Sequence, residues 1–169
     1  MALRQLYRAS AWTLFFLFFG VWWLADMVVG GTPAGHAVVT VLADFSNALQ
    51  LAWLYQLNVD LGRHCGFRSS GTENRFVAML VALLVILVFI PNGQAAETWT
   101  AWFAFIALFF PLLYLTSAHV AQKLVACEAA ALGHQRSRGG ATMMFMFIAI
   151  GIWFLQPRIK RLLVEAAHR

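Results

Sequence analysis

Charged side chains are scarce in this chain. Of its 169 residues, 11% are Asp, Glu, Lys or Arg, whereas 62% are hydrophobic. A soluble domain has about 25% charged and about 45–50% apolar residues, so this chain has too few polar side chains to cover a water-exposed surface. The high apolar content also excludes an intrinsically disordered chain. The composition therefore predicts an integral membrane protein.

Glycine, proline and cysteine are also few, at 12, 4 and 2 residues. These counts exclude a collagen-like fibre and a small secreted domain held by several disulfides. We expect Cys65 and Cys127 near the cytoplasmic face, where a reducing compartment keeps both as thiols. They can lie close together, but nothing in the sequence requires a bridge. The net charge of +5 forms no stripe suited to a nucleic-acid duplex, so we attribute it to membrane orientation and expect no nucleic-acid partner.

Motifs that carry chemistry are absent as well. The sequence contains no His-Glu-x-x-His, Cys-x-x-Cys or Gly-x-Ser-x-Gly motif, and its five histidines are scattered. A b-type haem would need two axial ligands at matched depth, but His119 and His36 are expected near opposite faces of the membrane. We therefore predict no catalytic residue, no metal site and no cofactor, haem included.

Apolar runs are what the sequence does contain, at residues 11–30, 36–57, 76–90, 98–126 and 141–155. Crossing about 30 Å of hydrocarbon takes about 20 residues, so the first two runs fit and the fourth projects beyond the membrane. The third run is short, but Ser70 and Glu73 form a capping box that extends it backwards. The fifth ends at Gln156-Pro157 and is either a thin crossing or a re-entrant segment. We predict an all-α, polytopic transmembrane bundle forming a single domain over residues 1–169, with five crossings or, alternatively, four crossings and a re-entrant segment.

Basic residues flank these runs asymmetrically. With the N-terminus inside, the connections and flanks that face the cytoplasm hold Arg4, Arg8, Arg63, Arg68, Arg75, Lys123, Arg136 and Arg138, whereas the opposite connections hold no Lys or Arg. The positive-inside rule then predicts an inner (cytoplasmic) membrane protein with a cytoplasmic N-terminus and a first segment retained as an anchor.

The C-terminal residues 157–169 depart from this asymmetry. Arg158, Lys160, Arg161 and Arg169 lie outside if the fifth segment crosses, and return to the cytoplasm if it is re-entrant. The apolar residues of this segment have helical spacing, which predicts an amphipathic tail at the membrane interface. An ordinary basic stop after the last helix is the alternative.

Two parts of the chain follow the same plan. Each has a long helix ending near a glycine, Gly62 or Gly133, then a basic connection and a short apolar segment that stops at Pro91 or Pro157. This order suggests a parallel internal duplication. The alternative is the similarity that any series of helical hairpins shows.

Two stretches within these parts carry a resemblance. The runs WLYQLNVDLG at 53–62 and IWFLQPRIKRL at 152–162 resemble patterns in small bacterial multi-pass membrane proteins of an uncharacterised domain family. The resemblance spans residues 51–163. It implies a bacterial membrane protein and brings with it no established activity.

Polar side chains within the predicted segments are the candidate functional residues. Asp26, His36, Asp44 and Asn47 are expected to form a polar pocket in the outer half of the bundle, which would suit a proton or a cation. The alternative is a set of helix-to-helix hydrogen bonds with a carboxylate at the interface. His119 is the fifth candidate.

Other polar residues of the fourth segment have simpler explanations. Lys123 and Glu128 follow near the cytoplasmic boundary, where they would reach the headgroups. Pro111 predicts a kink in the fourth segment.

Apolar helix surface is plentiful and chemical groups are sparse. We therefore expect a non-enzymatic accessory or structural subunit, whose partners are the lipid bilayer and either other membrane subunits or a second copy of itself. The first alternative is a small transport or proton-conducting component that uses an intramembrane carboxylate. The second is a redox or lipid-modifying membrane protein with a bound cofactor.

Overall fold

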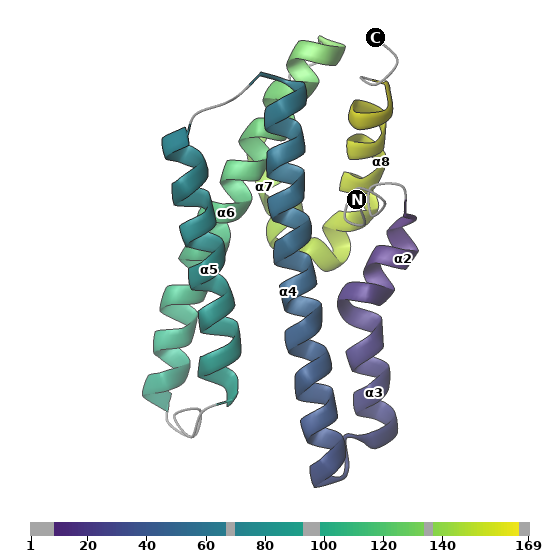
Figure 1. Cartoon of the computed structure of the whole chain (residues 1–169), viewed down its shortest axis with the longest axis vertical. Coiled ribbons are helices and arrows are strands. Elements are labelled where there is room, and N and C mark those ends of the chain that lie inside the picture. The colour runs from purple at the N-terminus through teal and green to yellow at the C-terminus, as the bar shows by residue number, and fades with distance from the viewer. Residues whose placement is uncertain (1–8, 67–69, 93–98, 134–136, 166–169) are drawn as a thin grey trace.

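The computed structural model describes residues 9–66, 70–92, 99–133 and 137–165, and every regular element within these ranges is a helix (Figure 1). The first apolar run forms α2 (Ala11–Phe15), the π-helix η1 (Phe16–Gly20) and α3 (Val21–Val29). The remaining helices are α4 (Pro33–His64), α5 (Ser70–Asn92), α6 (Trp99–Leu132), α7 (Arg138–Met146) and α8 (Ile148–Glu165). The all-helical expectation is confirmed.

Three helices among the described residues are long and apolar enough to cross a membrane: Ala11–Val29, Pro33–His64 and Trp102–Ala131. Neighbouring helices alternate in direction from α3 to α6, so α4 and α6 run the same way (Figure 1). With 32 residues at 1.5 Å each, α4 is about 48 Å long and exceeds the hydrocarbon thickness of about 30 Å. The length of α4 is therefore more than a membrane crossing requires.

The long helices α4 and α6 end in the same way. Each is followed by a glycine with positive φ, Gly66 at 72° and Gly133 at 66°, a conformation that stops a helix and that L side chains rarely adopt. Gly62, which the sequence predicts near the end of the first long helix, instead lies buried inside α4. The shared direction and shared ending of α4 and α6 fit the predicted duplication, which stays a prediction.

The fifth apolar run forms two short helices rather than one spanning helix. The nine-residue α7 ends at Met146, and after Phe147 the chain turns back, so that α8 ends beside the ends of α4 and α6 (Figure 1). A side chain at Gly151 would place its Cβ 1.8 Å from the carbonyl oxygen of Met144, so this close approach of the two helices requires glycine. Contrary to expectation, α8 continues through Pro157, because the residues around this proline are anchored in the core.

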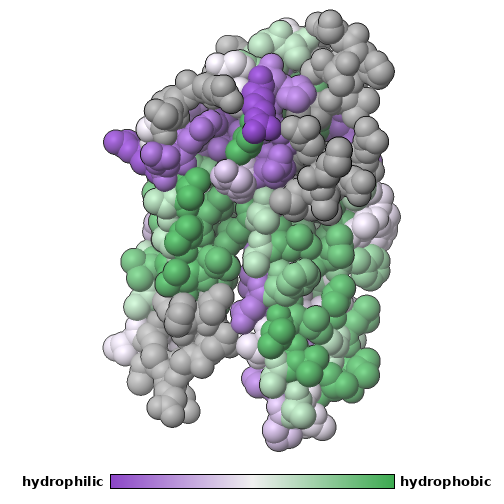
Figure 2. Space-filling model, in the orientation of Figure 1, coloured by the Kyte–Doolittle hydropathy of each residue, from purple (hydrophilic) through white to green (hydrophobic). Residues whose placement is uncertain are grey.

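The core lies at one end of the molecule. Buried side chains come from the second halves of α4 and α6 and from α2, η1, α5, α7 and α8. Figure 2 shows hydrophilic atoms gathered at this end and mainly apolar atoms over the visible remainder. The predicted C-terminal tail contributes to this core, because Ile159 and Leu162 on its apolar side are buried against the bundle. Its position at a membrane interface stays a prediction.

A disulfide joins Cys65 and Cys127, next to the C-terminal ends of α4 and α6, with a Cα–Cα distance of 5.5 Å. This corrects the expectation of two separate thiols. The sequence placed both cysteines near one face, but only the packing of α4 against α6 brings them within bonding distance.

Candidate functional site

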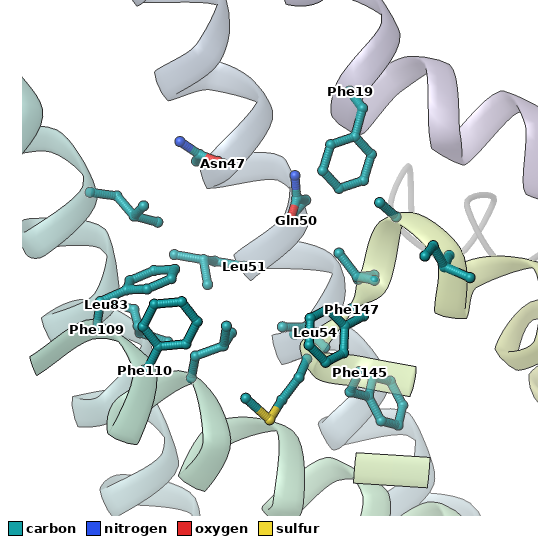
Figure 3. Close-up of a pocket in the computed structure, with 16 residues that line it drawn as sticks. Phe19, Asn47, Gln50, Leu51, Leu54, Leu83, Phe109, Phe110, Phe145 and Phe147 are labelled. Atoms are coloured by element: carbon teal, nitrogen blue, oxygen red, sulfur yellow. The ribbon is translucent and has the colours of Figure 1, made fainter. Parts of the chain in front are cut away.

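A cavity of about 390 Å³ lies where the two antiparallel hairpins α3–α4 and α5–α6 meet the turn between α7 and α8 (Figure 3). Pockets of this size hold small ligands. Its wall is mainly apolar and rich in phenylalanine, and it is formed by Phe19, Asn47, Gln50, Leu51, Leu54, Leu83, Leu87, Phe109, Phe110, Leu113 and the turn residues Phe145–Ile150.

Two carboxamides of α4, Asn47 and Gln50, supply the polar part of this wall. Asn47 is the fifteenth residue of the 32-residue α4, so the cavity lies near the middle of the predicted crossing. In Figure 3 both side chains extend from α4 on the side of the cavity away from Phe145 and Phe147. Gln50 donates from Nε2 to the carbonyl oxygen of Phe18 at 3.3 Å. Asn47 makes no side-chain hydrogen bond within the described part of the chain.

The π-helix η1 explains why α4 carries polar residues beside the cavity. A π-helical turn shifts the backbone hydrogen-bond pattern and leaves carbonyl oxygens in need of other donors. Gln50 supplies one donor, and Ser46 supplies a second from its Oγ to the carbonyl oxygen of Leu17 at 3.1 Å. These residues tie η1 to α4, whereas Asn47 has no such role in the described contacts.

The four residues predicted to form one polar pocket are not gathered in this cavity. Only Asn47 lines it. Asp26 on α3 and His36 on α4 are exposed near the turn that joins these helices, and Asp44 is half-buried one turn before Asn47. A proton or cation site that uses these residues stays a prediction.

His119 and Lys123 lie on one face of α6, in the buried end. The His119 ring stacks on Phe76 of α5 with ring centroids 5.0 Å apart, and its buried Nε2 has no hydrogen-bond partner among the described residues. Lys123 is 8% exposed and its Nζ also lacks a described partner, so it does not reach outward to headgroups as the sequence analysis expected. Within the described residues, no three His, Cys, Asp or Glu side chains are placed to hold a metal ion.

Glu128 and Arg158 form a buried ion pair that the sequence analysis missed. Arg158 donates to both carboxylate oxygens of Glu128, from Nε to Oε1 at 2.7 Å and from Nη2 to Oε2. The side chains are 4% and 12% exposed, respectively. Opposite charge could have suggested this pair. Five crossings would put Arg158 and Glu128 on opposite sides of the membrane, and only the re-entrant alternative brings them to the same side.

No protein-family model, curated protein or solved structure matches this chain. The resemblance to an uncharacterised family of bacterial membrane proteins therefore stays a prediction. The case for a function depends on the geometry of the chain itself.

Proposed function

We propose that this chain is a small, non-enzymatic accessory or structural subunit of a membrane complex, which packs in the bilayer against other subunits or a second copy of itself. The observation that carries the proposal is the one-sided burial of α6. None of the described side chains from Trp99 to Leu115 is buried, whereas most of those from Thr116 to Glu128 are.

The unburied half of α6 is apolar on all its faces. Its exposed large side chains include Trp102, Phe103, Ile106, Leu108, Phe110 and Leu115. A helix of this kind is stable only in a membrane or inside a protein. Association of helices in a bilayer is driven by van der Waals packing, and this half of α6 has few packing partners in its own chain. Helices of a neighbouring subunit would supply them.

We further propose four crossings and a re-entrant α7–α8 hairpin in a bacterial inner membrane, with the N-terminal end in the cytoplasm. This arrangement returns the basic side chains of α8 to the end of the bundle that holds Arg63 and Arg138. It therefore extends the positive-inside pattern to the described basic residues. It also places the Cys65–Cys127 disulfide at the cytoplasmic end, so this bond has to persist against the reducing compartment there.

Native mass spectrometry of the protein extracted in a mild detergent tests the subunit proposal. We expect an assembly of defined stoichiometry that contains other chains or further copies. Photo-crosslinking locates the contact: a benzophenone side chain at Phe103, which is 68% exposed, should join the partner, whereas the same group at Gln122, an exposed position on the packed half of α6, should not. A single chain in the mass spectrum, with lipid as the only product of crosslinking at Phe103, would refute the proposal.

A further inference from the structure

We infer that the cavity beside Asn47 binds an uncharged membrane lipid whose head is a flat ring bearing carbonyl oxygens, the chemical class of the prenylquinones. The inference concerns binding and does not depend on the subunit proposal. It is carried by three features of the described residues: the depth of the cavity, the amide of Asn47 and the phenylalanine side chains around it.

The depth of the cavity restricts what can enter it. It lies at the middle of α4 and is lined by the middle of α5 and the first half of α6. At this depth the neighbouring solvent is hydrocarbon, where an isolated charge is costly. The described lining residues carry no charged side chain, so an uncharged, membrane-dissolved ligand fits the site.

Asn47 indicates that the ligand has a hydrogen-bond acceptor. A carboxamide placed in hydrocarbon without a partner is unfavourable, because no water replaces the missing hydrogen bonds. Its Nδ2 amino group can donate to a carbonyl oxygen of a ligand. A plain acyl chain has no group at this depth that could accept this bond.

The aromatic wall favours a flat ring over a saturated chain. Phe19, Phe109, Phe110, Phe145 and Phe147 come from η1, α6, α7 and the turn between α7 and α8, and they converge on the cavity. Aromatic rings pack well against other rings in offset or edge-to-face arrangements. The volume of about 390 Å³ suits a ring and the first part of an attached chain, with the rest of the chain in the bilayer.

The test measures binding of decylubiquinone to the full-length protein in detergent, quantified by chromatography of the ligand retained after equilibrium dialysis. We expect saturable binding to the unchanged protein and about a tenfold or greater loss of affinity in Asn47→Leu, because the carbonyl then loses its donor. The matched control is Asn74→Leu, which removes the same group from an exposed position on α5 outside the cavity.

A second variant separates binding from folding. Leu113→Trp fills the cavity from α6 and should abolish binding while Asn47 is intact, with the thermal unfolding midpoint and the elution volume of each variant measured alongside. Absence of saturable binding, or equal affinity in Asn47→Leu, would overturn the inference. So would a tightly bound phospholipid that decylubiquinone does not displace, because it would assign the cavity to an acyl chain.

Discussion

Ser46 and Gln50 show how single polar side chains act in a chain that has few of them. Both donate to carbonyl oxygens of η1, at Leu17 and Phe18, and not to their own helix. Within a bilayer an unpaired carbonyl has no water to bond, so these hydrogen bonds stabilise a helix distortion that would otherwise be costly. Between α6 and α8, the charges of Glu128 and Arg158 are paired with one another.

Removing the Ser46 hydroxyl should destabilise the packing of η1 on α4. Ser46→Ala removes the hydrogen bond to the Leu17 carbonyl, and we expect a loss of about 1 kcal/mol in the free energy of unfolding. Thr40→Val is the control, because the Thr40 hydroxyl bonds only to the carbonyl of His36 within α4. Unfolding of both variants in mixed micelles at increasing denaturant measures the difference. Equal stability of the two variants would contradict the role given to Ser46.

Removing one partner of the Glu128–Arg158 ion pair should lower the free energy of unfolding more than replacing both partners. Glu128→Leu leaves the Arg158 guanidinium buried without a partner, at an expected cost of about 3–5 kcal/mol in unfolding free energy. The double variant Glu128→Leu/Arg158→Met should recover much of this stability. Arg161→Met, at an exposed position on α8, controls for loss of a positive charge. A double variant as unstable as Glu128→Leu would show that the pair is not the source of the effect.

At the scale of elements, the α7–α8 hairpin is the part that organises the cavity. Its turn supplies Phe145, Phe147 and Ile148 to the wall, and its second helix is held by three contacts from distant parts of the chain. These are the Glu128–Arg158 pair, a hydrogen bond from Gln156 Nε2 to the carbonyl of Ala9 at 3.0 Å, and an edge-to-face contact between Trp12 and Trp153 at 4.2 Å. Through these contacts, α8 packs against both α6 and the residues around Ala9 and Trp12.

The packing of α7 against α8 should be highly sensitive to substitution of Gly151. Gly151→Ala places a methyl group against the Met144 carbonyl, so α7 and α8 must separate. We expect Gly151→Ala to lower the free energy of unfolding. Helix propensity alone predicts the opposite, because alanine normally stabilises a helix by about 1 kcal/mol relative to glycine. Gly139→Ala on α7 is the control, because a Cβ there meets only Ser137 Oγ at 3.8 Å. Thermal unfolding of the two variants measures the contrast, and a stabilised Gly151→Ala would exclude the close approach.

At the scale of the whole molecule, one end is packed and cross-linked and the other is open. At the packed end, a disulfide links Cys65 and Cys127, which are 62 residues apart in sequence. The opposite ends of the hairpins α3–α4 and α5–α6 expose apolar side chains such as Val28 and Phe103. This division places the buried core and the most exposed apolar side chains at opposite ends of the molecule.

The proposed topology predicts that the C-terminal end of α4 and the second half of α8 both face the cytoplasm. In a Cys65→Ser/Cys127→Ser background, single cysteines at Arg63 and Arg161, both exposed, should be labelled by a membrane-impermeant maleimide only after spheroplasts are permeabilised. Five crossings would instead place position 161 outside, where intact spheroplasts would be labelled. Labelling of both positions in intact spheroplasts would reverse the proposed orientation.

Reduction of the disulfide should destabilise the purified protein. A cross-link closing a loop of this length restricts the unfolded chain, and we expect reduction to lower the free energy of unfolding by about 2–4 kcal/mol. Dithiothreitol should have no effect on the Cys65→Ser/Cys127→Ser variant, which serves as the control. An unchanged unfolding midpoint of the unsubstituted protein after complete reduction would contradict this prediction.

The all-helical, membrane-type architecture and the approximate positions of the long helices followed from the sequence alone. Apolar run length and residue spacing are local properties, so residues 36–57 correctly located α4 and the Ser70 capping box marked the start of α5. The presence of polar residues within the apolar run of α4 is likewise visible in the sequence. Their hydrogen-bond partners could not be predicted, because Ser46 and Gln50 donate to carbonyls of η1 that lie 29 and 32 residues away.

Only the tertiary structure decided how the last third of the chain folds and what surrounds Asn47. The sequence left open whether residues 141–155 cross or return, because this run is short for a crossing and stops at Gln156-Pro157. The break at Phe147 and the Gly151–Met144 contact are local, whereas the Arg158 pair reaches 30 residues back to Glu128 and holds α8 in the core. Composition and periodicity indicate whether one segment is helical and whether it faces lipid, water or protein. A cavity is formed by side chains of several packed segments, so it cannot be predicted from any one of them.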